Sequence, residues 1–261
     1  MNLIFFLICF IASVIGAICG IGGGIIIKPA LDALGTMSVT AISFLSGCTV
    51  LSMTGYTVIR SKLEGVSNIN MKTGTPLAVG AAFGGIAGKM LFESLASVFP
   101  DKNMIGAIQA ACLLIITIGT LIYALNRSGI KTYQMTNLPT CLVLGSILGI
   151  LSSFLGIGGG PVNLVILYYF FSMPTKAAAE NSLYIILFSQ LTSLISTLYS
   201  GNIPRFQPGL LILMIVAGIA GGVCGRKINK KIDENLVDKL SVYIMVVLIG
   251  INACNIWKFI Y

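Results

Sequence analysis

Long runs without charged residues recur along the chain and determine its predicted elements. A bilayer crossing needs roughly 20 mostly apolar residues, and nearly every run reaches that length. The short fourth run, 73–88, can continue past Lys89 because a Lys side chain can snorkel to the membrane surface. We therefore predict an all-α, polytopic membrane protein with about eight transmembrane helices. The charge-free runs are 1–27, 33–59, 73–88, 103–126, 132–175, 181–204, 206–225 and 240–257.

Two identical glycine clusters, Gly20–Gly24 and Gly156–Gly160, interrupt two of these runs. Each has the sequence Gly-Ile-Gly-Gly-Gly, and each Gly costs a helix interior roughly 1 kcal/mol relative to Ala. Unwound backbone at membrane depth is tolerated only where protein buries it or a water-filled cavity adjoins it. A helix over 3–34 would also be about 48 Å long, against a hydrocarbon core of roughly 30 Å. We expect each helix to break at its glycines and then to bend, re-enter or run along the surface.

The order of features after each glycine cluster predicts an internal duplication. An apolar run, a span dotted with polar residues and a basic loop follow in both halves. Each half then reaches a Gly-Gly-x-x-Gly-basic segment, at Gly84–Lys89 and Gly221–Arg226. We divide the chain into repeats at 1–127 and 128–261, with four spans each. The glycines of the closing segments have the spacing of small-xxx-small packing faces.

The number of spans in each half determines the symmetry that relates the repeats. An even number predicts parallel repeats, related by an axis along the membrane normal. If the pieces after the glycines cross separately, each half has five spans and the repeats are inverted.

Composition excludes several other classes. Charged residues make up 9% and the mean hydropathy is +0.98, whereas soluble domains carry about 25% charged residues. There is no His among the 261 residues, and the 7 cysteines form no Cys-x-x-Cys pair, so we predict neither a cofactor nor a metal site. No acid pair lies at the centre of a span, which disfavours an intramembrane enzyme. The basic residues lie in short loops, as is typical of membrane proteins, and no nucleic-acid partner is expected.

The motifs resemble the TauE/SafE sulfite exporter family, also called the toluene sulfonate uptake permeases. The first glycine cluster with Pro29 and Leu31 behind it is the most specific part, and the likeness extends over the whole chain. It implies a secondary transporter of the bacterial cell membrane that moves a small sulfur-containing anion, such as sulfite or an organosulfonate, by alternating access. The chain departs from the family at Lys28, at Pro161 and at Asn163. It also lacks the Pro-x-Leu of the second copy.

The helix that follows each break presents unpaired backbone N–H groups and a positive dipole end, which suit an anion. We expect the two clusters to meet near the bilayer midplane and to form the binding site together. Hydroxyl and amide side chains supply further donors, although Ser and Thr in membrane helices often bond their own backbone. The predicted binding residues are Gly22, Gly23, Gly24, Ser46, Thr49, Gly158, Gly159, Gly160, Asn163 and Gln190.

Two charged residues have competing interpretations. Lys28 either pairs with the anion or pairs with Asp32 one helical turn away. Glu180 either accepts a coupling proton or is an interfacial residue near Lys176. An anion channel, or a membrane protein without transport chemistry, remains the alternative function. The sequence contains no signal for an oligomeric state.

Eight crossings would distribute the basic loops almost evenly between the two sides of the membrane. The dense group from Arg226 to Lys231 favours its own side as cytoplasmic. Both termini are then predicted to lie outside.

Overall fold

The computed structural model describes residues 2–65, 67–99 and 102–260, and these residues form ten α-helices and no strand. This confirms the predicted all-α membrane fold. A short 3-10 turn, η1 (Arg127–Gly129), joins the two halves of the chain. The helices are α1 (Asn2–Cys19), α2 (Gly24–Leu34), α3 (Val39–Leu63), α4 (Met71–Val98), α5 (Lys102–Asn126), α6 (Leu138–Phe154), α7 (Pro161–Phe171), α8 (Thr175–Ser200), α9 (Pro208–Lys231) and α10 (Glu234–Ile260).

Seven of the described helices are long and apolar enough to cross a membrane: α1, α3, α4, α5, α8, α9 and α10. Helix α6 is shorter, at 17 residues, and α2 and α7 have 11 residues each. An 11-residue helix is about 16 Å long, roughly half the hydrocarbon core. Helix α6 and the pieces after the glycine breaks are thus shorter helices, and the seven long helices do not confirm the expected number of eight spans.

The glycine clusters end α1 and α6, as predicted. Gly20 and Gly22 have φ values of +73°, and Gly159 has a φ of +132°, conformations that glycine adopts without a Cβ clash. After the breaks the chain doubles back. The first residues of α1 share an apolar cluster with Ile27 and Leu31 of α2.

The second half turns in the same way. The amides of Tyr133 and Met135, which precede α6, donate to the carbonyls of Tyr169 and Phe170 at the end of α7. The end of α7 therefore lies beside the start of α6. Each broken helix thus forms a V-shaped hairpin that re-enters toward the side from which it began.

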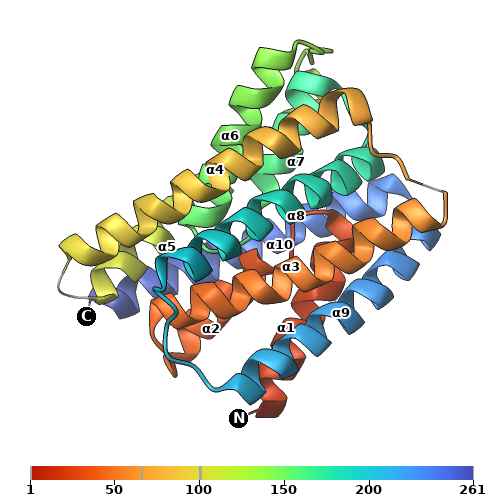
Figure 1. Cartoon of the computed structure of the whole chain (residues 1–261). Coiled ribbons are helices and arrows are strands. Elements are labelled where there is room, and N and C mark those ends of the chain that lie inside the picture. Colours follow the sequence, from red (N-terminus) through yellow and green to blue (C-terminus); the bar gives the residue numbers. More distant parts are fainter. Residues whose placement is uncertain (1, 66, 100–101, 261) are drawn as a thin grey trace.

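Helices of the two halves interleave. Helix α1 packs along α9, α6 packs along α4, and α3 and α8 run side by side in the middle of the molecule (Figure 1). Glycines permit the closest contacts: a Cβ at Gly84 would lie 2.1 Å from the Ser146 carbonyl oxygen, and one at Gly225 would lie 2.3 Å from that of Val14. These contacts confirm that the closing Gly-Gly-x-x-Gly segments are packing faces.

Helices at matching places in the two halves run in opposite directions. Gly106, near the start of α5, abuts Phe259 at the end of α10. Arg127, directly after α5, forms an ion pair with Asp238 near the start of α10. The end of α3 likewise meets the start of α8, where Ser61 donates to Glu180.

The expectation of parallel repeats, related by an axis along the membrane normal, is therefore wrong. The short return helices α2 and α7 give each half five helices instead of four. An odd number of direction changes inverts the second half relative to the first. The pseudo-twofold axis must then lie in the membrane plane.

This arrangement gathers most of the 16 Lys and Arg residues at one end of the helices, which we call the basic face. There the ends of α3 and α9 meet through ion pairs of Glu64 with Arg226 and Lys230. Both chain termini lie at the opposite end, the terminal face, which has Lys89, Arg205 and Lys258. The expectation that the basic loops divide almost evenly between the two sides of the membrane is therefore wrong. The basic face includes Arg60, Lys62, Lys72, Arg127, Lys131, Lys176, Arg226, Lys227, Lys230, Lys231 and Lys239.

We predict that the basic face is cytoplasmic and that both termini are outside. A fluorescent protein that matures only in the cytoplasm should stay dark when fused after residue 260. The same reporter should fluoresce when fused after Lys131. Bright fluorescence from the C-terminal fusion would reverse this orientation.

We predict that Gly84→Ala destabilises the packing of α4 on α6. The new Cβ would lie 2.1 Å from the Ser146 carbonyl oxygen, and overpacking of this kind costs about 1–3 kcal/mol. Gly119→Ala in α5 is the matched control, because nothing lies within 4 Å of its Cβ position. Thermal unfolding in detergent should show a lower midpoint for Gly84→Ala alone. Equal midpoints would contradict the packing role.

Candidate functional site

The two glycine clusters meet in the interior, as predicted. A Cβ at Gly24 would lie 2.0 Å from the carbonyl oxygen of Ile157, and one at Gly22 would lie 3.3 Å from that of Gly158. Residues 20–25 and 154–161 are all buried. We call residues 20–24 and 156–160 together the glycine crossing.

Contacts around the glycine crossing are reciprocal. Gly20 abuts Ala179 of α8, and Gly156 abuts Ser43 of α3. Ser43 and Ala179 are 136 positions apart, the same offset as the two glycines. The same exchange relates the contacts of Gly22 with Ile186 and of Gly158 with Val50. Exchanging the halves therefore reproduces the contacts, as a pseudo-twofold axis through the crossing requires.

Two cavities flank the crossing. The basic-face cavity has a volume of about 420 Å³, and the residues lining it include Ser61, Ala179, Glu180, Arg226 and Lys230. The terminal-face cavity has a volume of only about 30 Å³, and the residues lining it include Ser43, Lys89, Gly156, Gln190 and Thr197. One cavity is thus wide and its neighbour across the crossing is nearly closed.

The cavities are built from corresponding residues of the two halves. Arg226 and Lys89 each end a Gly-Gly-x-x-Gly-basic segment, 137 positions apart. Ser61 and Thr197 are 136 positions apart and supply a hydroxyl to each lining. Neither Lys89 nor Arg226 is among the site residues predicted from the sequence. The repeated basic residue after the last glycine was the signal that could have found them.

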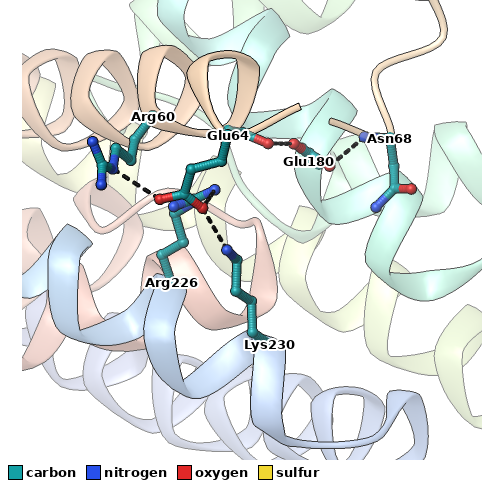
Figure 2. A network of polar contacts seen from close by, with 7 residues as sticks. Arg60, Glu64, Asn68, Glu180, Arg226 and Lys230 are labelled. Atoms are coloured by element: carbon teal, nitrogen blue, oxygen red, sulfur yellow. Dashed lines mark hydrogen bonds and ion pairs between the residues drawn. The ribbon is translucent and has the colours of Figure 1, made fainter. Parts of the chain in front are cut away.

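A polar network borders the basic-face cavity (Figure 2). The carboxylate of Glu64 accepts hydrogen bonds from Arg226 at 2.8 Å, Lys230 at 2.5 Å and Arg60 at 2.8 Å. The bond from Arg226, followed by that from Lys230, holds the pKa of Glu64 well below its usual range. This carboxylate therefore stays ionised at neutral and mildly acidic pH.

Glu180 lines the basic-face cavity and is already hydrogen-bonded. Its carboxylate accepts from the Ser61 hydroxyl and, at 2.7 Å, from the backbone amide of Asn68. Figure 2 shows these bonds beside the Glu64 network. Lys176 lines the same cavity. This position of Glu180 is compatible both with a coupling-proton site and with an interfacial residue near Lys176.

The predicted side-chain donors are all buried, but they are used differently. Gln190 lines the terminal-face cavity and donates to the Ser152 hydroxyl at 3.1 Å. The Thr49 hydroxyl donates to the Leu45 carbonyl at 2.8 Å, so it bonds its own helix. Ser46 is fully buried, and its hydroxyl has no hydrogen-bond partner within the described residues.

Asn163 lies directly beside the glycine crossing. Its side-chain amide donates to the Ser182 hydroxyl at 3.3 Å, and its carbonyl oxygen has no partner in the part of the chain that the structure describes. A Cβ at Gly159 would lie 3.4 Å from the Asn163 amide nitrogen. Asn163 therefore belongs to the same central region as the second glycine cluster.

Some of the expected backbone donors are already bonded. The amides of Ile157 and Gly158 both donate to the Ser152 carbonyl, at 3.3 and 3.4 Å. Gly156 lines the terminal-face cavity, but the predicted glycines line neither cavity. These are Gly22, Gly23, Gly24, Gly158, Gly159 and Gly160, which are buried in the contact between the two clusters.

Lys28 forms a buried ion pair with Asp32, and the two side chains are 1% and 4% exposed. The Lys28 ammonium lies 2.7 Å from the Asp32 carboxylate. This is the i,i+4 pair that the sequence offered as the alternative to an anion contact. Both residues belong to α2, and neither lines either of the two cavities.

Broken helices that meet between inverted halves, with a cavity on either side, are features that many membrane transporters share. The chain belongs to the sulfite exporter TauE/SafE family, whose model matches residues 5–253. It is 23% identical over 268 residues to the probable membrane transporter protein YunE of Bacillus subtilis (strain 168), which covers 94% of this chain and 93% of that protein. No solved structure matches the chain. The protein is a multi-pass membrane transporter, which in bacteria resides in the cell membrane.

We predict that Gly159→Val and Gly23→Val abolish transport while the protein still reaches the membrane. Gly159 has a φ of +132°, and a Cβ there would lie 2.4 Å from Ile186 Cδ1. A Cβ at Gly23 would lie 3.2 Å from the Ala12 carbonyl oxygen. Gly250→Val is the control, because its Cβ position is open. Uptake per amount of protein in the membrane should fall more than tenfold for both crossing variants alone, and unchanged uptake would reject the crossing as the transport site.

Proposed function

We propose that this protein moves a small sulfur-containing anion, such as sulfite or an organosulfonate, across the cell membrane by alternating access. The observation that carries the proposal is the pair of corresponding cavities, about 420 and 30 Å³, on opposite sides of the glycine crossing. A transporter of this kind needs one binding region that opens to one face at a time. Inverted halves supply it, because exchanging their conformations converts a state open to one face into a state open to the other.

The charges and donors of the cavities support an anion as the substrate. Lys176, Arg226 and Lys230 line the wide cavity, and Lys89 lines the narrow one. An oxyanion that leaves water loses hydrogen bonds and needs donors in exchange. Hydroxyl, amide and backbone N–H groups provide donors without burying another full charge. The family and the donor set together favour a sulfur oxyanion or sulfonate.

The glycine crossing is the proposed central binding region. The backbone of Gly22–Gly24 and of Gly158–Gly160 would donate to the anion at the starts of α2 and α7, as helix N-termini do for oxyanions. Ser46, Asn163 and Gln190 would add side-chain donors, and Thr49 would do so only by leaving its bond to Leu45. Glu180, in the wide cavity, is the proposed site for a coupling proton.

Counterflow in proteoliposomes tests this function. Vesicles loaded with unlabelled sulfite are diluted into trace radiolabelled sulfite. They should transiently accumulate label above equilibrium, because outward transport of unlabelled sulfite returns the carrier to the outside, where it binds labelled sulfite. Sulfate, taurine and an aromatic sulfonate should be compared as competitors. Label that equilibrates without overshoot would indicate a channel. Failure of every sulfur-containing anion to enter would reject the substrate class.

A further inference from the structure

The two basic residues that close the repeated segments occupy corresponding places in the two cavities. Arg226 of α9 lines the basic-face cavity, and Lys89 of α4 lines the terminal-face cavity. Their side chains are equally enclosed, at 13% exposed each. Each half of the molecule therefore supplies one cation, and each cation faces a different side of the membrane.

Each of these cations is paired with a carboxylate. Arg226 lies 2.8 Å from Glu64, and Lys89 lies 3.5 Å from Glu93. A cation in a largely enclosed site needs such a partner, because removing a charge from water is costly. A carboxylate and a sulfur oxyanion offer a guanidinium or ammonium group the same kind of acceptor, an anionic oxygen. The two acidic side chains thus occupy the positions that a bound anion would take.

The carboxylates also connect the two halves of the molecule. Glu64, at the end of α3, binds Arg226 and Lys230 of α9. Glu93 of α4 accepts a hydrogen bond at 3.2 Å from Asn202, in the connection between α8 and α9. An anion that displaces Glu64 from Arg226 therefore removes a contact between halves that must move relative to one another. Lys89 and Glu93 both belong to α4, so displacement of Glu93 breaks a contact within one helix.

We propose that Arg226 and Lys89 receive the transported anion in the two access states, and that Glu64 and Glu93 hold these cations when no anion is bound. The inference rests on the proposed anion transport and deepens it, since it assigns one entry residue to each face. Anion entry from the basic face exchanges Glu64 for substrate at Arg226. Anion entry from the terminal face exchanges Glu93 for substrate at Lys89.

Initial rates in membrane vesicles of the two orientations test the assignment. Arg226→Gln should raise the KM for anion supplied at the basic face at least tenfold and leave the KM at the terminal face within about twofold. Lys89→Gln should show the reverse. Arg226→Lys should recover part of the loss at the basic face. Equal KM changes at both faces, or loss of kcat alone, would overturn the proposal.

Two further variants separate binding from structural effects. Arg60→Gln is the matched control, because Arg60 contacts the same carboxylate, is 53% exposed and does not line the basic-face cavity. It should leave both KM values unchanged. Glu64→Gln should lower the KM at the basic face severalfold, because it removes the competitor of the anion. A merely structural Glu64 would instead give lower protein levels and no gain in apparent affinity.

A binding measurement distinguishes failure of this inference from failure of the proposed function. Thermal unfolding of the purified protein should be followed with sulfite, sulfate, phosphate and nitrate. If only a non-sulfur oxyanion stabilises the wild type and Arg226→Gln abolishes the effect, the sulfur assignment fails and the role of Arg226 stands. If sulfite is transported and neither Gln variant changes its KM, the proposed function stands and this inference fails. If no anion stabilises or crosses with the wild type, both are rejected.

Discussion

The contact between the two unwound glycine segments is the constraint on which the rest of the structure depends. Backbone at membrane depth must be enclosed by protein, because lipid offers it no hydrogen bonds. Gly24 lies so close to Ile157 that a Cβ would come within 2.0 Å of its carbonyl oxygen. Each segment therefore covers the other, and α3 and α8 cover both. The close pairs α4 with α6 and α1 with α9 then follow from the need to enclose the two hairpins.

Inversion of the halves follows from the same two segments. Because α2 and α7 return toward the side on which α1 and α6 begin, each half has an odd number of helices. Equivalent side chains then lie on opposite sides of the crossing, as Arg226 and Lys89 do. The same inversion brings Arg60, Arg226 and Lys230 together around Glu64. Although the two halves have similar sequences, the two faces of the molecule therefore differ in cavity size and in charge.

Much of this fold could be predicted from the sequence. Hydropathy predicts the helical membrane class. Consecutive glycines in an apolar run predict the breaks, because each Gly costs a helix interior about 1 kcal/mol relative to Ala. The direction of the pieces after the breaks could not be predicted. An apolar stretch such as 24–34 has the same composition whether it crosses, re-enters or follows the surface. The sense of the symmetry depends on that one choice.

The parts of the candidate site that depend on backbone geometry alone could be predicted. The hydrogen-bond partners of its side chains could not, because several partners compete for each side chain. The meeting of Gly22 with Gly158 follows from the repeat. Sequence does not show that the Thr49 hydroxyl bonds Leu45, since a Thr on a buried helix face can bond its own backbone or a ligand. In the sequence, Arg226 and Lys89 are only the basic ends of two packing segments. Only the fold shows that those ends line cavities.

The departures from symmetry concern the two return helices. Lys28 and Asp32 form a buried pair in α2, and the corresponding positions of α7 are Leu164 and Tyr168. Asn255 and Lys258 of α10 also hold α2, through the carbonyls of Pro29 and Ala33. Helix α7 is held by the backbone bonds from Tyr133 and Met135 and by ring contacts of Tyr169 with Tyr123 and Tyr133.

This difference bears on the free energies of the two access states in the proposed mechanism. Lys28 and Asp32 lie on the same helix and move together, so movement of α2 must break its bonds to Asn255 and Lys258. Movement of α7 must instead break the bonds from the Tyr133 and Met135 amides and rearrange its ring contacts. The two hairpins therefore differ in what their movement costs, although their backbones correspond. Under the proposed alternating access, unequal costs in the two halves would make the two access states unequal in free energy.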